Sequence, residues 1–350
     1  MNETAQNRRP DGPILAIESS CDETACAILA PDGTVLAQRV ISQDGHADFG
    51  GVVPEIAARA HLALLPNLVR ATLQDANTPP ATLSFIAAST GPGLIGGLIV
   101  GSGFAKGLAL ALGIPFVAVN HVEAHALTAR LPGVVPDGAP FPYLLLLVSG
   151  GHCQCIAVEG VGHYRKLGGT IDDAAGEAFD KVAKMLGLGW PGGPELEKLA
   201  REGNPKAITL PAPSGGLAPF GKAPLPRQFA ADLAASFQQA VADVVTNRIE
   251  HALDMMPEAK LLVAAGGVAA NTVLRAALEK TAAQRGLRFA APPLRLCTDN
   301  AVMVGWAALE TWQEAATRHL PPINDNALRP RPRWPLEDMA SRFEAETPTT

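Results

Sequence analysis

The chain has few cysteines and no excess of positive charge. Its five cysteines are an odd number, and no two of them form a C-x-x-C pair. This pattern argues against a disulfide framework and for a reducing compartment. The formal net charge of −6 gives no general electrostatic reason to bind nucleic acid. Any RNA contact therefore needs a local basic surface or a basic partner, and we expect neither DNA nor a membrane as a partner.

An apolar leader and a long uninterrupted hydrophobic run are also missing from the sequence. Residues 1–13 begin with a polar stretch, which predicts a flexible lead-in and the cytoplasm as the location. Residues 76–105 carry no charge, but the glycines of the run Gly91 to Gly97 interrupt them. They predict a buried strand, turn and helix, and not a membrane span.

What the chain does contain is 47% apolar and 18% charged residues over 350 positions. Such a chain is globular and long enough for two domains. Prolines and glycines mark a linker and an insertion. We predict a first lobe over 14–130, a linker over 131–142, a second lobe over 143–316 with an extended insertion at about 187–227, and an extended C-terminal tail over 317–350.

Apolar and alternating runs predict the same order of elements twice. The first half has strands at 14–18, 25–29 and 34–37, a helix at 53–76, a strand at 85–88, a helix to about 112 and a strand at 115–119. The second half has strands at 143–148, 153–159 and 163–167, helices at 174–186 and 231–255, a strand at 260–265, a helix from about 270 and a last helix at 298–316. This duplicated βββαβα unit with mixed sheets resembles the two-lobed α/β plan of the actin, sugar-kinase and Hsp70-like ATPases, the ASKHA fold, in which two lobes enclose a nucleotide.

Two histidines follow the expected strand at 115–119. His121 and His125 are four residues apart, which is about 400° of rotation on an α-helix, so both rings lie on one face and can bind one divalent cation. Asp299, at the start of another expected helix, is our candidate for the third ligand. Two imidazoles and one carboxylate leave positions open for substrate, as catalysis requires. The alternative is a chance pair of histidines on a surface or in a core.

Glu123 lies two residues from each histidine. In the metalloprotease patterns the glutamate directly follows the first histidine or directly precedes the second. Here it projects about 200° away from His121, towards the back of the helix. This position argues against a zinc peptidase of that type, which stays a less favoured alternative.

Two turns are candidates for contacts with phosphate. Ser149-Gly150-Gly151-His152 joins the first two strands of the second lobe, where glycines let backbone N–H groups approach an anion. An ordinary hairpin turn is the alternative. The corresponding turn of the first lobe carries Asp22 and Glu23. Since carboxylates repel phosphate, they act through a metal, a water or an amine, or they only cap the turn.

Three further positions have weaker signals. Asn271 ends the run Gly266 to Asn271 between a strand and a helix, where it can contact a base or ribose or cap the helix. Asp180 lies in a helix that starts with acidic residues. The turn Pro191-Gly192-Gly193-Pro194 is of the rigid sort that wraps a ribose or a phosphate.

Together these segments closely resemble the family of tRNA N(6)-adenosine threonylcarbamoyltransferases, once described as O-sialoglycoprotein endopeptidases. The motifs occur in the family's order and span roughly residues 14 to 316. They are Ile17 to Thr24, Gly51 to Arg59, Gly91 to Gly97, Asn120 to His125, Leu147 to His152, Ile171 to Lys181, Pro191 to Pro194, Gly266 to Asn271 and Thr298 to Ala301.

The resemblance implies transfer of a threonylcarbamoyl group from threonylcarbamoyl-AMP to the exocyclic amine of an adenosine beside the tRNA anticodon. It implies one divalent metal, iron or else zinc, held by His121, His125 and Asp299. It also implies an adenylate site, to which Glu197 is not assigned. The residues implied for that site are Leu147, Val148, Ser149, Gly150, Gly151, Asp180, Gly193 and Asn271.

Relatives work with partner proteins, so a paralogous ASKHA subunit, a small P-loop ATPase and an enzyme that supplies the adenylate are expected. Our candidates for the proton acceptor are Asp22 and Glu23. The rival hypothesis is an ATP-driven binding or chaperone-like module in which no group is transferred, and the metallopeptidase is a third.

Overall fold

The structure is a computed structural model that describes residues 10–43, 46, 51–189, 191–210 and 225–344. Contacts between residues divide the chain into two compact units. Unit 1 takes in Met1–Phe141, Val158–Arg165 and Thr298–Thr350, whereas unit 2 takes in Pro142–Ala157 and Lys166–Cys297. The chain therefore passes from the first unit to the second at residues 141–142, inside the stretch we expected to be a linker.

Unit 1 is built on a five-stranded sheet in the order β3-β2-β1-β4-β5. Its strands are β1 (Ile14–Glu18), β2 (Glu23–Leu29), β3 (Val35–Ser42), β4 (Ile86–Gly91) and β5 (Phe116–Asn120). The first three strands form the antiparallel meander that the sequence predicts, and β4 and β5 continue the sheet in parallel with β1. Strands β1, β4 and β5 are buried along their whole length, as expected of parallel strands with helices on both faces.

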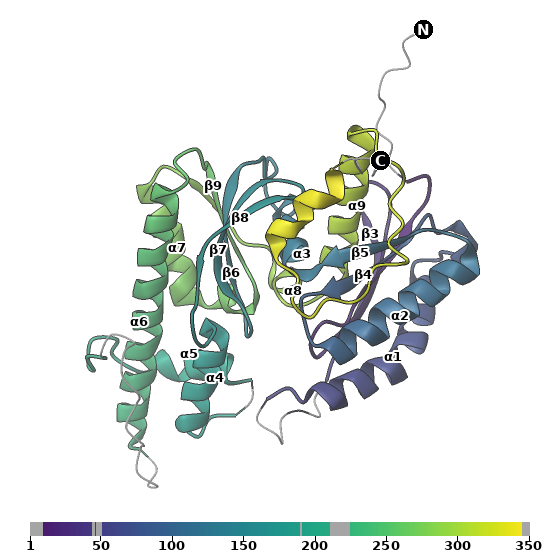
Figure 1. Cartoon of the computed structure of the whole chain (residues 1–350). Helices are drawn as coiled ribbons and strands as arrows, with labels where there is room; N and C mark the ends of the chain where they lie inside the picture. The colour runs from purple at the N-terminus through teal and green to yellow at the C-terminus, as the bar shows by residue number, and fades with distance from the viewer. Residues whose placement is uncertain (1–9, 44–45, 47–50, 190, 211–224, 345–350) are drawn as a thin grey trace. The chain divides into compact units, whose positions relative to one another are not determined.

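Helices cover both faces of this sheet (Figure 1). Its helices are α1 (Pro54–Asp75), α2 (Ile95–Leu112), α3 (His121–Leu127) and α9 (Ala301–Thr317). An added Cβ on Gly101 of α2 would approach Ile17, whereas one on Gly305 of α9 would lie 3.1 Å from the Cβ of Ala16. Successive residues of a strand point to opposite faces, so α2 and α9 pack on opposite sides of β1.

Unit 2 repeats this topology. Its strands are β6 (Tyr143–Val148), β7 (Cys153–Gly160), β8 (His163–Gly169), β9 (Leu261–Ala265) and β10 (Arg288–Ala290). The order β10-β9-β6-β7-β8 is the order of the first sheet read from the other edge, and β9 is again parallel to the first strand of its unit. The predicted ASKHA duplication is therefore confirmed.

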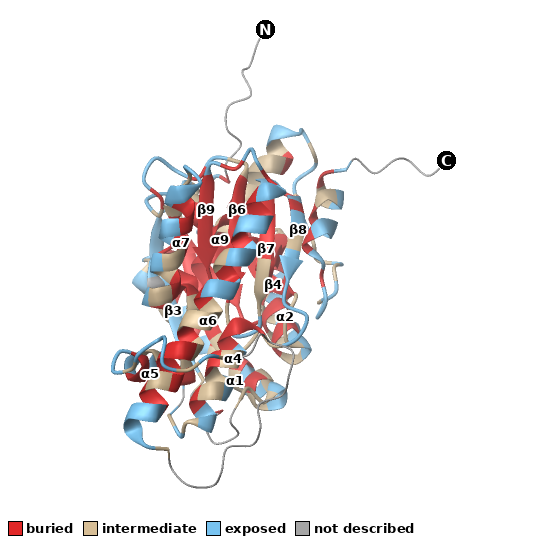
Figure 2. Cartoon of the chain, turned by 90° about the vertical axis from the view of Figure 1, so that its left-hand side faces the viewer, coloured by how far each residue is buried: buried red, intermediate tan, exposed pale blue. Residues whose placement is uncertain are grey.

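The helices of unit 2 are α4 (Ala175–Met185), α5 (Gly192–Ala200), α6 (Arg227–Asp254), α7 (Thr272–Gln284) and α8 (Leu294–Cys297). One apolar core joins β6 and β9 to α6 and α7, and another joins α4 and α5 to the first half of α6. Figure 2 shows the buried residues concentrated on β6 and β9, with exposed residues on the outer side of α6. Long α6 thus supports both cores.

The structure differs from our predictions in its short elements. We missed β10, whose three residues are too few to show a period. We described residues 187–227 as an extended insertion, but α5 lies within it, and residues 190 and 211–224 are outside the described part. The tail that we expected to be extended contains the 3₁₀ helix η5 (Leu336–Phe343). Most of the expected lead-in, residues 1–9, is also outside the described part.

The last long helix is placed differently from our expectation. We assigned residues 143–316 to the second lobe, but Thr298–Thr350 belongs to unit 1, where α9 packs on β1 and β2. The tip of the β7–β8 hairpin, Val158–Arg165, also groups with unit 1. Such exchanges of chain between units leave no signal in local sequence periodicity, because they depend on contacts far apart in the sequence.

Helix α2 has the length and apolar composition of a membrane span, the only such helix in the described part of the chain, and 33% of that window is buried. It follows β4 and a short turn, which confirms the predicted strand, turn and helix. Its exposed large apolar side chains are Ile95, Ile99 and Leu110.

Candidate functional site

Helix α3 positions the two histidines. It begins directly after the buried strand β5, and Asn120 caps its N-terminus, because Asn120 Oδ1 accepts hydrogen bonds from Val122 N at 2.9 Å and Glu123 N at 3.3 Å. Such a cap stabilises a short helix by about 1 kcal/mol. His121 is thus the first residue of a capped helix whose start is set by a strand in the core.

The three predicted metal ligands come together in unit 1. Asp299 Oδ1 lies 3.0 Å from His125 Nε2 and 3.4 Å from His121 Nε2. The two imidazole rings are nearly perpendicular, at 88°, with their centroids 4.8 Å apart. One ligand atom from each residue lies within 4.8 Å of the others. Two ring nitrogens and a carboxylate oxygen therefore converge as they do in catalytic sites for zinc or non-haem iron.

Glu18 at the end of β1 orients His121, a role that we did not predict. Its Oε2 lies 3.1 Å from His121 Nδ1, and Ser20 Oγ lies 3.1 Å from the same nitrogen. Glu18 itself is fully buried and accepts hydrogen bonds from Ser20 N and Ser89 Oγ. A carboxylate on the far nitrogen of an imidazole keeps the near nitrogen free for a metal and makes it more basic.

Electrostatics favour charged forms in this cluster. Burial by itself raises the pKa of Asp299, but the neighbouring His121 and His125 outweigh it and hold the pKa well below its usual value. Burial lowers the pKa of His121, but Asp299 and Glu18 outweigh it and raise the pKa well above its usual value. The cluster therefore has an affinity for positive charge, which a proton satisfies in the metal-free form.

The donor set fits a divalent metal. His125 Nδ1 is buried and has no hydrogen-bond partner among the described residues, while its Nε2 points to Asp299. His121 and His125 are 4% and 1% exposed, so an ion bound between them is largely removed from water. The charge of a cation would offset the cost of burying the Asp299 and Glu18 carboxylates close together.

Asp22 and Glu23 follow β1, with Asp22 in the turn and Glu23 as the first residue of β2. Burial, then the charges of Asp299 and Asp22, raise the pKa of Glu23 to about 9. The carboxyl group of Glu23 therefore responds to the charge of Asp299, one of the three predicted ligands. A catalytic role for Asp22 and Glu23 stays a prediction.

Packing fixes the turn that carries these carboxylates. Ser19 Oγ donates to Gly97 O at 3.0 Å, and an added Cβ on Gly101 would lie 1.9 Å from Ser19 Oγ. His61 of α1 contacts both ends of the turn, with Nδ1 2.8 Å from Thr24 Oγ1 and Nε2 3.0 Å from Cys21 O. Gly93, Gly97 and Gly101 thus make room for the turn, because a Cβ on each would collide with Ser19 or Ser20.

Glu123 lies on the back of α3, as its spacing predicted. It is almost completely buried, and its Oε1 accepts a hydrogen bond from Tyr164 at 2.9 Å. Burial raises the pKa of Glu123 to about 7 although Arg342 and Tyr164 act in the opposite direction. A carboxylate tied to the β7–β8 hairpin in this way does not serve as the general base of a metallopeptidase, which must contact the metal-bound water.

The predicted phosphate turn of unit 2 is open to solvent. Ser149 N donates to His152 O at 2.7 Å, and His152 N donates to Ser149 Oγ at 3.1 Å, which closes the turn. No atom of the described residues lies within 4 Å of a Cβ added to Gly150 or Gly151. By contrast Leu147 and Val148 are fully buried in β6, so the turn, and not these two side chains, is the part available to a ligand.

Asp180 and Gly193 are joined in the structure. Asp180 Oδ1 accepts hydrogen bonds from Gly192 N at 3.0 Å and Gly193 N at 3.2 Å, so this side chain caps the start of α5. Burial raises the pKa of Asp180, although the two backbone N–H groups act in the opposite direction. The two predicted residues therefore form one local unit between α4 and α5.

Asn271 caps α7, as one of our two interpretations held. Its Oδ1 accepts from Leu274 N at 3.0 Å, and its Nδ2 donates to Gln238 Oε1 at 2.7 Å. Both groups of its amide are thus engaged within unit 2. We had not predicted Gln238, which no local pattern distinguishes from the other residues of α6.

A cavity of about 130 Å³ lies next to this pair. Glu197 lines it and accepts hydrogen bonds from Thr272 N at 3.1 Å and Thr272 Oγ1 at 2.6 Å. Gln238 and Thr272 line it as well, together with Ala200, Arg201, Pro205, Ala235, Gln239 and Val273. It is a concave site with amide, hydroxyl and carboxylate groups, as small-molecule sites have.

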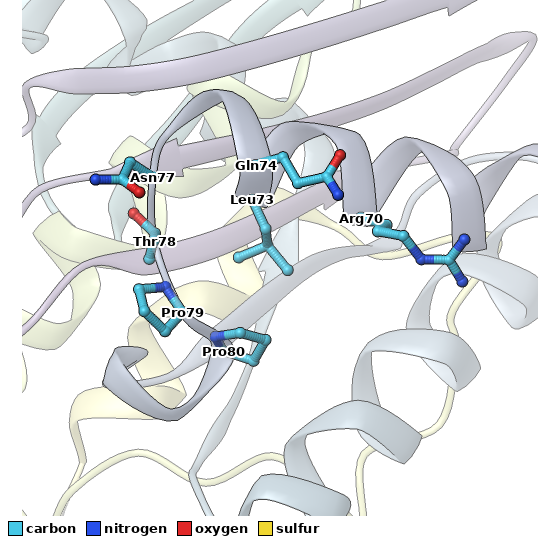
Figure 3. Close-up of a pocket in the computed structure, with 7 residues that line it drawn as sticks. All are labelled: Arg70, Leu73, Gln74, Asn77, Thr78, Pro79 and Pro80. Carbon is cyan, nitrogen blue, oxygen red and sulfur yellow. The ribbon is translucent and has the colours of Figure 1, made fainter.

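A wider depression of about 360 Å³ lies at the C-terminal end of α1 and in the loop that follows (Figure 3). Its lining residues are Arg70, Leu73, Gln74, Asn77, Thr78, Pro79 and Pro80. None of the predicted site residues is among them, so it is not the candidate site.

Comparison with known proteins identifies a family. The model of the family described as TsaD, tRNA N6-adenosine threonylcarbamoyltransferase, matches residues 34–306. A protein of that name from Gluconobacter oxydans is 61% identical over 94% of this chain and 94% of its own length. Another, from Granulibacter bethesdensis, is 56% identical and covers 94% of this chain and 95% of its own length.

Solved structures support the fold alone. HypF from T. kodakarensis is 14% identical with a TM-score of 0.56, covering 85% of this chain and 47% of that one. Component A of the Acidaminococcus fermentans (R)-2-hydroxyglutaryl-CoA dehydratase is 17% identical with a TM-score of 0.51, covering 88% of this chain and 100% of that one. The family match, the near full-length relatives and the converging histidines and aspartate lead to one conclusion, that the chain belongs to the TsaD family of tRNA N6-adenosine threonylcarbamoyltransferases.

Proposed function

We propose that this chain transfers the threonylcarbamoyl group from threonylcarbamoyl-AMP to the N6 amine of the adenosine next to the anticodon, in tRNAs that read codons beginning with A, and releases AMP. The observation that carries the proposal is the near full-length identity of 61% to a protein with this named activity. The bond that forms joins N6 to the carbamoyl carbon. The bond that breaks joins that carbon to the phosphate oxygen, which leaves on AMP with its negative charge.

Unit 1 supplies the metal ligands in this proposal. His121, His125 and Asp299 hold one divalent ion, iron or zinc, which when bound polarises a carbonyl or neutralises a leaving oxygen as a Lewis acid. Glu18 keeps the imidazole of His121 turned so that Nε2 faces the ion. Asp22 and Glu23 are the groups that we propose to orient the amine or to accept the N6 proton. Because the pKa of Glu23 is raised to about 9, Glu23 would accept a proton at neutral pH only after a bound cation had lowered that pKa.

Unit 2 supplies the adenylate contacts. The backbone N–H groups of Gly150 and Gly151, with the hydroxyl of Ser149 as a further donor, receive the phosphate, since the turn has open space above its glycines. We further propose that Asp180 and Gly193, through the start of α5, and Asn271, through Gln238, shape the part of the site that binds the nucleoside. In this arrangement Leu147 and Val148 support the turn from within the sheet.

We also propose protein partners, namely a paralogous ASKHA subunit and a small P-loop ATPase, with the reaction in the cytoplasm where tRNA is found. Support comes from exposed apolar side chains on two helices of unit 1. Leu62 of α1 is 66% exposed, and Ile99 and Leu110 of α2 are 54% and 67% exposed. These side chains lie on two helices that contact each other, and a partner protein would remove them from water.

One experiment separates the candidate functions. The full chain is incubated with tRNA, threonine, bicarbonate and ATP in the presence of the partner proteins, and the nucleosides of the digested tRNA are measured by mass spectrometry. Threonylcarbamoyladenosine that forms only when this chain is present supports the proposal. ATP turnover without a modified nucleoside would instead support a chaperone-like module, and cleavage of added proteins would support a peptidase.

A further inference from the structure

The chain after α9 is held along the edge of the first sheet. We call residues Asn324 to Trp334 the strap. At its start, Asp325 N donates to Phe116 O at 2.7 Å, and Ala118 N donates to Asp325 Oδ2 at 2.8 Å. These bonds pair the strap with β5, which is an edge strand of its sheet. The first part of the segment that we expected to be an extended tail is therefore tied to the core of unit 1.

The second half of the strap is held just as firmly. Arg331 N donates to Thr90 O at 2.8 Å, and Gly93 N donates to Pro332 O at 3.2 Å. An added Cβ on Gly91 would lie 1.9 Å from Arg331 O, so only glycine leaves room for the strap at this point. Trp334 is buried, and its carbonyl accepts from Asn120 Nδ2 at 3.1 Å.

Three exposed arginines project from this fixed backbone, at positions 329, 331 and 333. Arg329 and Arg333 form no ion pair with any carboxylate that the structure describes, and Arg331 reaches Asp338 only at 4.0 Å. Six other arginines of unit 1 lie between 2.6 and 3.2 Å from a carboxylate oxygen. These are Arg39, Arg59, Arg130, Arg165, Arg318 and Arg342.

The three arginines thus concentrate positive charge on the strap, although the net charge of the chain is −6. Prolines at 330 and 332 fix φ and restrict the residue before them, so the arginines lose little backbone freedom when they bind a ligand. Arginine donates planar, paired hydrogen bonds that match phosphate. A row of exposed arginines on a rigid backbone, two of them without an ion pair among the described residues, is therefore suited to a polyanion.

The strap also runs close to the metal cluster. Asn120, which bonds Trp334, directly precedes His121. Gly93, which bonds Pro332, lies beside the turn whose Ser20 contacts His121 Nδ1 at 3.1 Å. If a polyanion binds to the strap, the parts of that molecule next to the bound phosphates would lie near His121.

We propose that the strap is an RNA-binding surface, on which Arg329, Arg331 and Arg333 contact phosphates of the substrate tRNA beside the adenosine to be modified. The inference rests on the proposed function, because that function supplies the RNA. Proteins that act on a base take it out of its stack, and loops of RNA allow this. Contacts with the flanking phosphates then set the position of the strand without reading its sequence.

The test removes two of these charges and compares the result with a matched loss of charge elsewhere. The variant is Arg329→Gln with Arg333→Gln, and the control is Arg39→Gln with Arg59→Gln, whose arginines are also exposed in unit 1. Binding of a fluorescent tRNA to the full chain is measured by anisotropy over a series of KCl concentrations. Metal content and thermal unfolding are measured for each protein.

We expect the strap variant to bind tRNA about tenfold more weakly near physiological salt, with the slope of log K against log salt reduced by about 1 for each arginine. In the modification assay its KM for tRNA should rise while kcat stays near the wild-type value. Metal content and unfolding should be unchanged. The control variant should retain wild-type affinity and slope.

Four results would overturn the inference. The strap variant could bind tRNA like wild type, or the control could lose as much affinity, which would make the effect one of net charge. The strap variant could also lose binding only to anionic phosphatidylserine vesicles, which would make the strap a membrane surface. If the wild-type chain modified tRNA but the strap variant matched it in KM, the proposed function would stand and the inference would fall.

Discussion

The two units carry corresponding turns with opposite properties. In unit 1 the turn between β1 and β2 is packed under its neighbours, with Ser19 and Ser20 only 1% and 3% exposed. In unit 2 the turn between β6 and β7 holds Gly150 and Gly151 in open space. Because both sheets have the same strand order, these turns occupy the same place in two copies of one plan.

The difference shows that the same turn can have different roles in two copies of one fold. The packed turn brings Glu18 and Ser20 to His121, and so it orients a proposed metal ligand. The open turn has no side chains over its glycines and so presents bare backbone N–H groups, which suit an anion. One copy thus uses the position for precise placement of side chains, and the other uses it for access to the main chain.

The largest effect is expected when a proposed metal ligand of unit 1 is removed. Asp299→Ala should abolish metal retention and modification, because Asp299 is the only carboxylate in the described three-residue cluster. Adenylate affinity, which belongs to unit 2 in our proposal, should stay near wild type. Elemental analysis of the purified variant and calorimetry with an adenine nucleotide are the measurements. Full metal content would show that the ion, if any, is held elsewhere.

The next effect concerns the carboxylates of the packed turn. Asp22→Asn or Glu23→Gln should lower single-turnover rates about 100-fold if the carboxylate accepts the proton, since general-base assistance typically supplies 10²–10⁴. Adenylate binding should not change. Rates are measured with the adenylate supplied directly. Wild-type rates in both variants would reduce these residues to caps of the turn, because the amides still accept backbone hydrogen bonds.

A smaller effect is expected from the group behind His121. Glu18→Gln keeps an oxygen for Ser20 N but removes the charge that holds Nδ1, so metal affinity should fall by about tenfold or somewhat more. Competition with a chelator gives the affinity. Glu310→Gln is the control, because it removes another largely buried carboxylate of unit 1, the partner of Arg130. Equal losses in both variants would mean that only general stability had changed.

The smallest effects compare the two turns directly. Gly101→Ala should lower the free energy of unfolding by about 2 kcal/mol, because its Cβ would lie 1.9 Å from Ser19 Oγ in a packed region. Gly151→Ala should leave the free energy of unfolding within about 0.5 kcal/mol of wild type, since nothing surrounds its Cβ. It should still weaken adenylate binding, by about tenfold if one hydrogen bond to phosphate is lost. Denaturant titration and calorimetry provide both values.

Much of the fold could be predicted because both units depend on long elements with clear patterns. The buried strands β1 and β6 and the long helices α1 and α6 lie within a few residues of their predicted ranges. The short strand β10 and the 3₁₀ helix η5 could not, because their positions come from packing and not from periodicity. The assignment of α9 to unit 1 also depends on tertiary contacts alone.

Part of the candidate site could also be predicted from the sequence. The spacing of His121 and His125 is visible in the sequence, and we chose Asp299 because the two histidines need a third ligand. Glu18 and Gln238 act through contacts 103 and 33 residues away along the chain, so no window around them shows their role. One signal in the sequence could nevertheless have indicated Glu18, because it is a charged residue at the end of an apolar strand.

Unit 1 is discontinuous, and this has a consequence for its synthesis. Two of the proposed metal ligands lie on α3, but the third, Asp299, follows the whole of unit 2 in the chain. Domains generally fold as units while the ribosome extends the chain. The nascent chain must therefore carry an unfinished first unit, lacking α9 and its third ligand, until unit 2 has been made. If these three residues hold the ion as we propose, a truncated product that presents both histidines would still lack the third ligand, and its metal content would be lower than that of the full chain.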